Sequence, residues 1–487
     1  MSELLAHEVV LTGAPRHTRH VDAEAYVVVP AETLADLEAY RRLRRDAFVH
    51  EQGLFVGSDA DEVDEDPRTR VLVARTGEGE VLGGVRLHPS THPACGGRDL
   101  GWWSGSRLVV APDARLHLGV GAALVRAACA TAEEAGALRF DAVVQAQNAV
   151  LFRRLGWTVL GETELLGHPH VRVDWPIGRV QRLVEATKTS LADLLQGLAG
   201  GPAGLGGAGF VGDDASPVPG ADLVAACDAI LPAMVERDPE WAGWCAVLVN
   251  VNDVAAMGAL PVGLLDAVGA RDASFARRVL RGLTDAASAF GVPVLGGHTQ
   301  LGVPGALSVT ALGRPHPSLP GPVPGGGGSP GHRLRVTADL SGGWRPGYTG
   351  RQWDSSSHRS AAELRSLLDV VPALAPTAAK DVSMAGLVGT TGMLAEASGC
   401  RAVLDVADVP TPDGASVGDW LTCFPGFAMV TAEEPARGEH TAHGVLPDVV
   451  TTSTCGDLVA GAGVGLRWPD GVITEAVHTA VTGLGAA

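Results

Sequence analysis

A glycine-rich stretch between residues 199 and 212 and a Pro/Gly segment at 315–332 separate three blocks of this chain. The first block, residues 20–176, alternates strand-like with helix-like patterns. In the first block, VLVARTG and VLGGVRLHP are typical of strands, and GVGAALVRAACATAEEAG has the spacing of an amphipathic helix. In the third block, roughly residues 333–487, the strand-like runs are RLRVTADL, AVLDVADV and FAMVTAEE. Because 487 residues also exceed the size of one ordinary hydrophobic core, we expect several domains of α/β or α+β class.

The composition excludes several classes of protein. Hydrophobic residues make up 46% of the chain and charged residues 19%, which is typical of a globular protein. No apolar run reaches the roughly 18 residues of a membrane-spanning helix, and the N-terminus lacks the features of a signal peptide, so we expect a cytoplasmic protein without a membrane partner. The net charge of −18 repels phosphate backbones and argues against nucleic-acid partners. The seven cysteines form no C-x-x-C pair, which disfavours a zinc site or a disulfide framework.

Residues 106–136 combine a strand, a short glycine loop and a long helix. Glycines at the start of a helix let backbone N–H groups point at an anion, and the helix dipole adds partial positive charge. This pattern predicts a pyrophosphate site, whose candidate residues are Leu118, Gly119, Val120, Gly121 and Ala122. A G-x-G pattern alone is about equally typical of a helix that begins with glycine for packing reasons, so the interpretation depends on the neighbouring segments.

Three segments, in order, resemble the GNAT acyltransferase family. RRLRRDAFVHEQGLF resembles the opening helix of the family, the glycine loop resembles its pyrophosphate loop, and QAQNAVLFRRLGW, with Asn148 and Phe152, resembles its second signature. The resemblance covers about residues 21–176, after an N-terminal extension of residues 1–20. It implies a GNAT fold that binds acetyl-CoA or another acyl-CoA and transfers the acyl group to a small-molecule amine.

The GNAT resemblance also implies roles for individual residues. Arg115 is the candidate polar contact to CoA, although it lies one place away from the position that the family uses. Phe152 replaces the tyrosine that often protonates the departing thiolate, so solvent or another acid must do so. Glu51 is the candidate base for the amine proton, with His50 and His117 as substitutes, and strand amides would hold the carbonyl oxygen. The alternative interpretation of Glu51 is a carboxylate on a helix surface.

Acidic and amide side chains recur beside glycine turns in the second block. They occur in four places: Asp213 and Asp214; Asp228; Asn250, Asn252 and Asp253; and Gly296, Gly297, His298 and Thr299. We expect the third group at the end of a strand, before a helix of small residues. A single group of this kind is explained by turn formation, because Asp, Asn and Gly favour turns. Four such groups favour a site for Mg²⁺ that bridges nucleotide phosphates, because Mg²⁺ prefers oxygen ligands.

The motifs GDDA, NVNDVAAMGALP and GGHT, in this order, resemble the superfamily of AIR synthase, thiamine-monophosphate kinase, selenophosphate synthetase and HypE. The resemblance implies a PurM-like domain of two α/β halves, residues 177–314 and 333–487, joined by a Pro/Gly linker at 315–332. It also implies a homodimer that forms through strands of the N-terminal half. The whole arrangement resembles nitrogen-starvation acetyltransferases fused to AIR synthase-like proteins.

By this resemblance, ATP and Mg²⁺ would lie between the two halves. The implied metal or phosphate ligands are Asp213, Asp214, Asp228, Asp253 and Asp381, and the implied nucleotide contacts are Asn252, Gly296, Gly297, His298 and Thr299. Lys380, one of only two lysines in the chain, would offer its charge to phosphate. The other lysine, Lys188, is a weaker candidate.

These observations support three hypotheses. The first is a bifunctional enzyme that acylates an amine and uses Mg-ATP to activate a small nitrogen-containing metabolite. The second is a nucleotide sensor, in which the AIR synthase-like part binds ATP without turnover and regulates the acetyltransferase. The third is an acetyltransferase alone, with the rest of the chain as a dimerisation scaffold.

Overall fold

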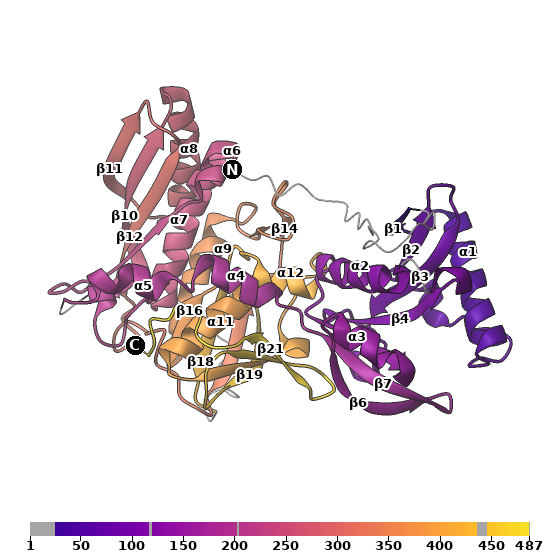
Figure 1. Cartoon of the computed structure of the whole chain (residues 1–487). Helices are drawn as coiled ribbons and strands as arrows, with labels where there is room; N and C mark the ends of the chain where they lie inside the picture. Colours follow the sequence, from indigo (N-terminus) through magenta and orange to yellow (C-terminus); the bar gives the residue numbers. More distant parts are fainter. Residues whose placement is uncertain (1–24, 116–118, 202–203, 436–445, 487) are drawn as a thin grey trace. The chain divides into compact units, whose positions relative to one another are not determined.

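The computed structural model describes residues 25–115, 119–201, 204–435 and 446–486 (Figure 1). The chain divides into two compact units: unit 1 is Met1–Arg179 with Ser416–Gly418, and unit 2 is Val180–Ala415 with Asp419–Ala487. Among the helices of the described ranges, none combines the length and the apolar character needed to cross a bilayer.

Unit 1 is built on a seven-stranded sheet with the order β1-β2-β3-β4-β5-β7-β6. All neighbouring strands are antiparallel except β4 and β5, which are parallel. The strands are β1 Tyr26–Pro30, β2 Arg70–Thr76, β3 Val81–Pro89, β4 Trp102–Val110, β5 Arg139–Gln145, β6 Thr158–Leu165 and β7 His168–Trp175. The main helices are α1 Leu34–Arg45, which continues as a π-helix over Asp46–Glu51, α2 Val120–Glu134 and α3 Ala149–Arg154.

The parallel strands β4 and β5 separate along their length. The two strands pair with each other from Trp102 opposite Arg139 to Gly105 opposite Ala142. Beyond this point β4 continues to Val110 and β5 to Gln145, and the two strands no longer pair with each other. On its other side, β4 carries a bulge over residues 107–108, where its register against β3 shifts. A bulge bends a strand and increases its twist, so it accounts for the opening between the two strands.

Unit 2 contains two sheets that correspond to its two halves, and a short hairpin. The first sheet has the order β11-β10-β12-β9-β8, with β8 Ser216–Pro217, β9 Val224–Ala229, β10 Ala259–Ala270, β11 Val294–Leu301 and β12 Ala306–Pro315. The second has the order β16-β18-β13-β19-β17-β20-β21, with β13 Arg333–Ala338, β16 Ala378–Asp381, β17 Arg401–Asp405, β18 Ala428–Glu433, β19 Thr451–Val459, β20 Val464–Arg467 and β21 Ile473–Val477. The hairpin pairs β14 Gly343–Trp344 with β15 Trp353–Asp354.

Helices cover these sheets. They are α4 Arg179–Thr187, α5 Leu191–Leu195, α6 Pro232–Arg237, α7 Pro239–Ala256, α8 Ala273–Phe290, α9 Ala361–Ser366, α10 Val370–Leu374, α11 Gly386–Ala397 and α12 Val417–Thr422. The strands predicted over RLRVTADL, AVLDVADV and FAMVTAEE are confirmed as β13, β17 and β18. The mixed α/β architecture predicted from the sequence is therefore confirmed.

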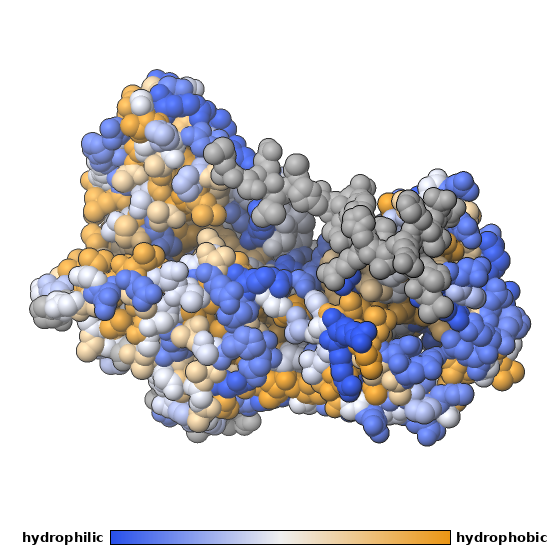
Figure 2. All heavy atoms as spheres, viewed as in Figure 1, coloured by the Kyte–Doolittle hydropathy of each residue, from blue (hydrophilic) through white to orange (hydrophobic). Residues whose placement is uncertain are grey.

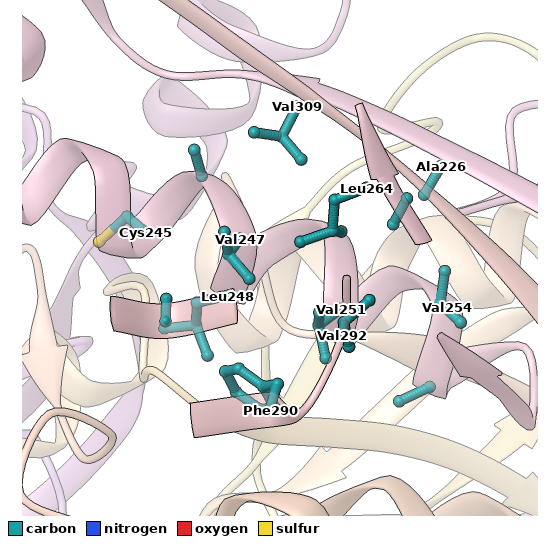
Figure 3. Close-up of a cluster of buried hydrophobic side chains, with 14 of the residues drawn as sticks. Ala226, Cys245, Val247, Leu248, Val251, Val254, Leu264, Phe290, Val292 and Val309 are labelled. Carbon is teal, nitrogen blue, oxygen red and sulfur yellow. The ribbon is translucent and has the colours of Figure 1, made fainter. Parts of the chain in front are cut away.

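Helix α7 is the centre of the hydrophobic core in the first half of unit 2 (Figure 3). The labelled side chains of this core are Ala226, Cys245, Val247, Leu248, Val251, Val254, Leu264, Phe290, Val292 and Val309. The prediction that Asn250 to Asp253 end a strand is wrong, because all of them lie within α7. The helix is buried on nearly every side, and an apolar run without a polar face does not distinguish a buried helix from a buried strand.

The Pro/Gly segment at 315–332 connects the two halves, but it is not a free tether. Val323 is buried, and its N–H donates to Met257 O at 2.9 Å. Ala379 of β16 donates its N–H to Pro324 O at 3.1 Å. The segment therefore packs against both halves of unit 2.

Candidate functional site

Three buried or half-buried carboxylates meet in unit 2. Asp214 precedes β8, Asp253 lies in the last turn of α7, and Asp381 ends β16. One oxygen from each of the three lies within 4.8 Å of the others. All four residues of β16 are buried, and the strand pairs with β18, so its end is held firmly in place. The fold thus brings together side chains from both halves of unit 2, which we call the carboxylate cluster.

The Lys380 ammonium fixes the loop that carries Asp213 and Asp214. Nζ donates to Asp213 Oδ1 at 2.8 Å and to Asp214 Oδ1 at 2.9 Å. The N–H of Asp381 donates to Asp214 Oδ2 at 3.0 Å, and the N–H of Gly325 donates to Asp213 Oδ2 at 2.6 Å. Every oxygen of Asp213 and Asp214 therefore has a hydrogen-bond donor.

Burial controls the protonation of these groups. Burial raises the pKa of Asp214 to about 6, although Lys380 opposes the rise. The pKa values of Asp253 and Asp381 are also raised, first by burial and then by the neighbouring carboxylates. Burial acts to lower the pKa of Lys380, but Asp214 and Asp213 outweigh it, so this pKa is raised and the lysine stays charged. One buried cation therefore faces several carboxylates, more than its charge can balance.

The Asp381 carboxylate is the least satisfied group of the carboxylate cluster. Both of its oxygens are buried and accept no N–H hydrogen bond from the described residues. The Asp253 carboxyl can donate to Asp381 only when it is protonated itself. A buried carboxylate without donors is costly, and a divalent cation removes that cost. The cluster offers the oxygen ligands that Mg²⁺ prefers, so the residues fit this ion.

Asp228 lies on β9, near the carboxylate cluster. Its N–H donates to Asn250 Oδ1 at 3.1 Å, which ties β9 to α7. Burial raises the pKa of Asp228, and Lys188 opposes the rise. The charge of Asp228 in turn contributes to the raised pKa values of Asp253 and Asp381. Asp228 therefore adds negative charge near the cluster, but it is not one of the three carboxylates that share the 4.8 Å contact.

The other nucleotide-binding candidates lie outside the carboxylate cluster. Asn252 is buried in α7, and its amide donates to Gly426 O at 2.8 Å, which joins the two halves. Residues 296–299 belong to β11, an edge strand of the first sheet whose residues are all exposed. In the part of the chain that the structure describes, no side-chain hydrogen bond links His298 or Thr299 to the cluster.

Gly325 contributes to the cluster, and the sequence interpretation missed it. A Cβ atom at this position would lie 2.6 Å from Asp213 Oδ1 and 2.7 Å from Lys380 Cε, so a side chain does not fit. The sequence signal was present in the glycine run at 325–328, which was assigned to the linker. The glycine is required for the close approach of the backbone to the ion pair.

The predicted pyrophosphate loop of unit 1 is open at its described end. Gly119 precedes α2, has a φ of +64° and is exposed. A Cβ atom added at this position would have no heavy atom within 4 Å. Val120 is buried, while Gly121 and Ala122 are half-buried. His117 and Leu118 lie outside the described residues. The start of the 15-residue helix α2 is therefore accessible to an anion.

Glu51 and Arg115 form an ion pair on the surface of unit 1. Both guanidinium Nη atoms of Arg115 donate to the Glu51 carboxylate at 2.6 Å, and Nε donates to Val110 O at 3.0 Å. The hydrogen bond from Arg115 lowers the pKa of Glu51. Glu51 is therefore ionised at neutral pH, and the guanidinium of Arg115 is engaged by Glu51 and by Val110 O.

A cavity of about 140 Å³ opens where β4 and β5 separate. It is much larger than the ~10–15 Å³ that holds one water molecule, so it can admit a small organic group. Asn148, at the start of α3, and the buried Phe152 line it, and Phe152 packs edge-on against Trp157 with ring centroids 5.3 Å apart. Arg107 of the β4 bulge lines it as well. No local sequence motif marks a bulge, so Arg107 cannot be singled out from the sequence alone.

Comparisons with known proteins agree with this division. Residues 67–159 match the model of the acetyltransferase (GNAT) domain, and residues 212–314 and 330–443 match those of the N-terminal and C-terminal domains of AIR synthase related protein. An uncharacterized protein of Synechocystis sp. is 33% identical over 254 residues, which cover 50% of this chain and 77% of that protein. A thiamine-monophosphate kinase of Caulobacter vibrioides is 28% identical over 290 residues, which cover 52% of this chain and 79% of that protein. The solved thiamine monophosphate kinase of Aquifex aeolicus is 20% identical, with a TM-score of 0.41, over 55% of this chain and 93% of that chain.

Proposed function

Because this chain belongs to the AIR synthase-related family and carries a GNAT acetyltransferase domain before it, we propose that it is a bifunctional enzyme. Unit 1 transfers an acyl group from acyl-CoA to an amine. Unit 2 uses Mg-ATP to activate a small nitrogen-containing metabolite. The observation that carries the second activity is the carboxylate cluster, in which the buried Asp381 carboxylate has no N–H donor among the described residues.

In unit 2, we assign the divalent cation to Asp214, Asp253 and Asp381. Mg²⁺ bound to them would neutralise phosphate oxygens of ATP and so favour phosphoryl transfer. The likeness to a thiamine-monophosphate kinase supports this class of reaction. Lys380 uses two of its three donors on Asp213 and Asp214, so its main role is to hold the loop in position, with one donor left for a ligand.

In unit 1, the start of α2 would bind the pyrophosphate of acyl-CoA, and the cavity between β4 and β5 would receive the acyl group and the amine. Glu51, which its lowered pKa keeps ionised, would accept the amine proton through a water molecule, since it is not among the residues that line the cavity. Phe152 has no acidic proton, so solvent would protonate the departing thiolate. Glu51→Gln tests this role: turnover should fall while acetyl-CoA binding is retained.

Ligand-induced thermal stabilisation of the full chain tests the bifunctional assignment. Acetyl-CoA and Mg-ATP should each raise the melting temperature, since a ligand that binds the folded state stabilises it. The two increases should be independent if the ligands occupy different sites. Release of free thiol with small amines, and of phosphate with small amides and amidines, then tests turnover. No stabilisation by either ligand would refute the proposal.

We also propose a homodimer through β11. This edge strand has unpaired backbone groups on one side, and its apolar residues Val294, Leu295 and Leu301 are 42%, 57% and 53% exposed. Figure 2 shows hydrophobic surface, in orange, at the edge of unit 2 that carries β10 and β11. Exposed edge strands and apolar patches are typical of surfaces that pair with a second chain.

We place the proposed chemistry in the cytoplasm on the basis of the cysteines. All seven are free thiols, and six of them are buried. Disulfides are rare in reducing compartments, and free buried cysteines are common there.

A further inference from the structure

Arg107 occupies an unusual backbone position in unit 1. Its φ of +52° lies in the left-handed region, although it is not glycine, and it belongs to the bulge of β4. The buried Tyr40 hydroxyl donates to Arg107 O at 2.8 Å and holds the bulge in place. Strained positions of this kind persist where the surrounding structure enforces them, and they are concentrated at binding and catalytic sites.

The guanidinium of Arg107 is only partly used by the protein. Nε and Nη2 donate to Asp59 O at 3.2 and 3.0 Å, and Nη2 also donates to Asp61 Oδ2 at 2.9 Å. Nε lies 3.4 Å from Asp59 Oδ2 as well. The guanidinium carbon lies 4.5 Å from the centroid of the Phe55 ring. For Nη1, the described residues provide no hydrogen-bond partner. Arg107 therefore keeps a donor group for a ligand, and its side chain is 16% exposed.

The carboxylates near Arg107 are also paired with neighbouring arginines. Arg86 forms a bidentate pair with Asp61, through contacts of 2.5 and 2.9 Å. Arg44 forms another with Asp64, at 2.6 and 3.0 Å. Burial, and then Arg86, lower the pKa of Arg107, so an additional anion beside it would be favourable.

The remainder of the cavity is apolar, with a few neutral polar groups. Phe48, Val125, Phe140 and Trp157 supply apolar walls, and Gln145 and Asn148 supply amides. Among the described residues that line the cavity, Arg107 and His170 are the only titratable side chains. A lone ammonium group would be repelled by Arg107, whereas a carboxylate would pair with it.

We propose that the acyl acceptor is an amine that also carries a carboxylate, of the apolar amino-acid class, and that Arg107 binds this carboxylate. The inference rests on the proposed acyltransferase activity and names its substrate class. The amine nitrogen attacks the thioester carbonyl carbon, a C–N bond forms and the C–S bond breaks. The amine proton passes to the base, and the thiolate takes a proton from solvent to give free CoA. Arg107 determines specificity and takes no part in the proton transfers.

A paired acceptor panel tests this inference on the full chain. L-leucine, L-methionine and L-phenylalanine are each compared with their carboxamide as acceptors of the acetyl group of acetyl-CoA. The readout is kcat/KM for product formation, per concentration of unprotonated amine. We expect each acid to exceed its amide by roughly 10- to 100-fold, as for a hydrogen bond to a charged group.

Substitutions at Arg107 provide the second arm. In Arg107→Gln the ratio of acid to amide should fall towards one through the KM of the acid, whereas Arg107→Lys should retain part of it. Arg68→Gln is the matched control, because Arg68 is 43% exposed and pairs with Asp66 on the surface of the same unit. If Arg107→Gln does not fold, the wild-type panel and Arg107→Lys still decide the question.

The outcomes separate this inference from the proposed function. Equal kcat/KM for acids and amides in the wild type would overturn it, as would a ratio that Arg107→Gln leaves unchanged. Acetyl-CoA binding without acylation of any acid in the panel would overturn it too, while the binding of acyl-CoA would still stand. Absence of acetyl-CoA binding would refute the acyltransferase assignment itself, and this inference with it.

Discussion

The ammonium of Lys380 lies 2.9 Å from Asp214 Oδ1, although the two residues are 166 positions apart in the sequence. Their side chains are 2% and 11% exposed. The lysine belongs to the second half of unit 2 and the aspartate to the first, so this ion pair forms only when both halves fold against each other. It fixes the loop of the carboxylate cluster.

The first prediction is that Lys380→Met destabilises unit 2. Removal of one partner from a buried ion pair leaves the other charge uncompensated, which typically costs about 3–5 kcal/mol. Thermal unfolding of the full chain measures the effect. Lys188→Met is the control, because it makes the same substitution at the other lysine, which is only half-buried. Equal melting temperatures for the two variants would contradict the prediction.

The second prediction concerns Mg²⁺. In Asp381→Asn the mutual repulsion of the carboxylates falls, so the ligand-free protein should be as stable as the wild type or more stable. The additional stabilisation that Mg²⁺ gives in the presence of ATP should be lost, since one of its oxygen ligands is gone. Differential scanning calorimetry with and without Mg²⁺ measures both effects. Asp285→Asn, at an exposed position of α8, should keep the full Mg²⁺ response.

The third prediction separates helix stability from acyl-CoA binding. Gly121→Asp places a carboxylate in the first turn of α2, where the helix dipole favours it, so the melting temperature should not fall. The same charge repels a pyrophosphate, so the Kd for acetyl-CoA should rise by roughly 10-fold or more. Gly121→Ala is the control, because its Cβ would meet only Val110 Cγ2 at 3.6 Å. Calorimetric titration measures the Kd; equal affinities in the two variants would argue against a pyrophosphate at this helix.

The fourth prediction concerns pH. Asp174 of β7 lies directly opposite Asp141 of β5, and burial followed by Asp141 raises the pKa of Asp174 to about 6. A raised pKa means that folding disfavours the ionised form, so stability is lost as the pH rises from about 4 to about 6. Asp174→Asn should therefore stabilise unit 1 by about 1–3 kcal/mol at neutral pH and by nothing below about pH 4. Thermal unfolding over this range measures it, with Asp113→Asn at an exposed site as the control.

The fifth prediction concerns the dimer. Leu295→Glu on β11 should convert the protein to a monomer, because a charge would have to be buried in the paired apolar surface. Leu194→Glu on α5 is the control, since Leu194 is 74% exposed and belongs to a helix rather than to the edge strand. Light scattering after size exclusion gives the mass. A wild-type monomer, or a dimer that survives Leu295→Glu, would contradict this interface.

Local sequence patterns were sufficient for much of the fold. The strand-like runs VLVARTG and VLGGVRLHP predicted β2 and β3, and the glycine loop before an amphipathic run predicted α2. These features depend on neighbours within a few residues, which the sequence displays directly. The α7 segment was misassigned, because uniform burial removes the periodicity that distinguishes a helix from a strand.

The sequence by itself determined which groups are available: the acidic motifs of unit 2, the glycines before α2, and Lys380 as one of only two lysines. Tertiary structure alone decided which of them meet. It joined Asp214 and Asp253 to Asp381, left residues 296–299 on an exposed edge, and brought Gly325 against the ion pair. It also placed Arg107, at the bulge of β4, among the residues that line a cavity. The reason is that contacts between distant segments depend on how whole sheets and helices pack, and no local pattern records that packing.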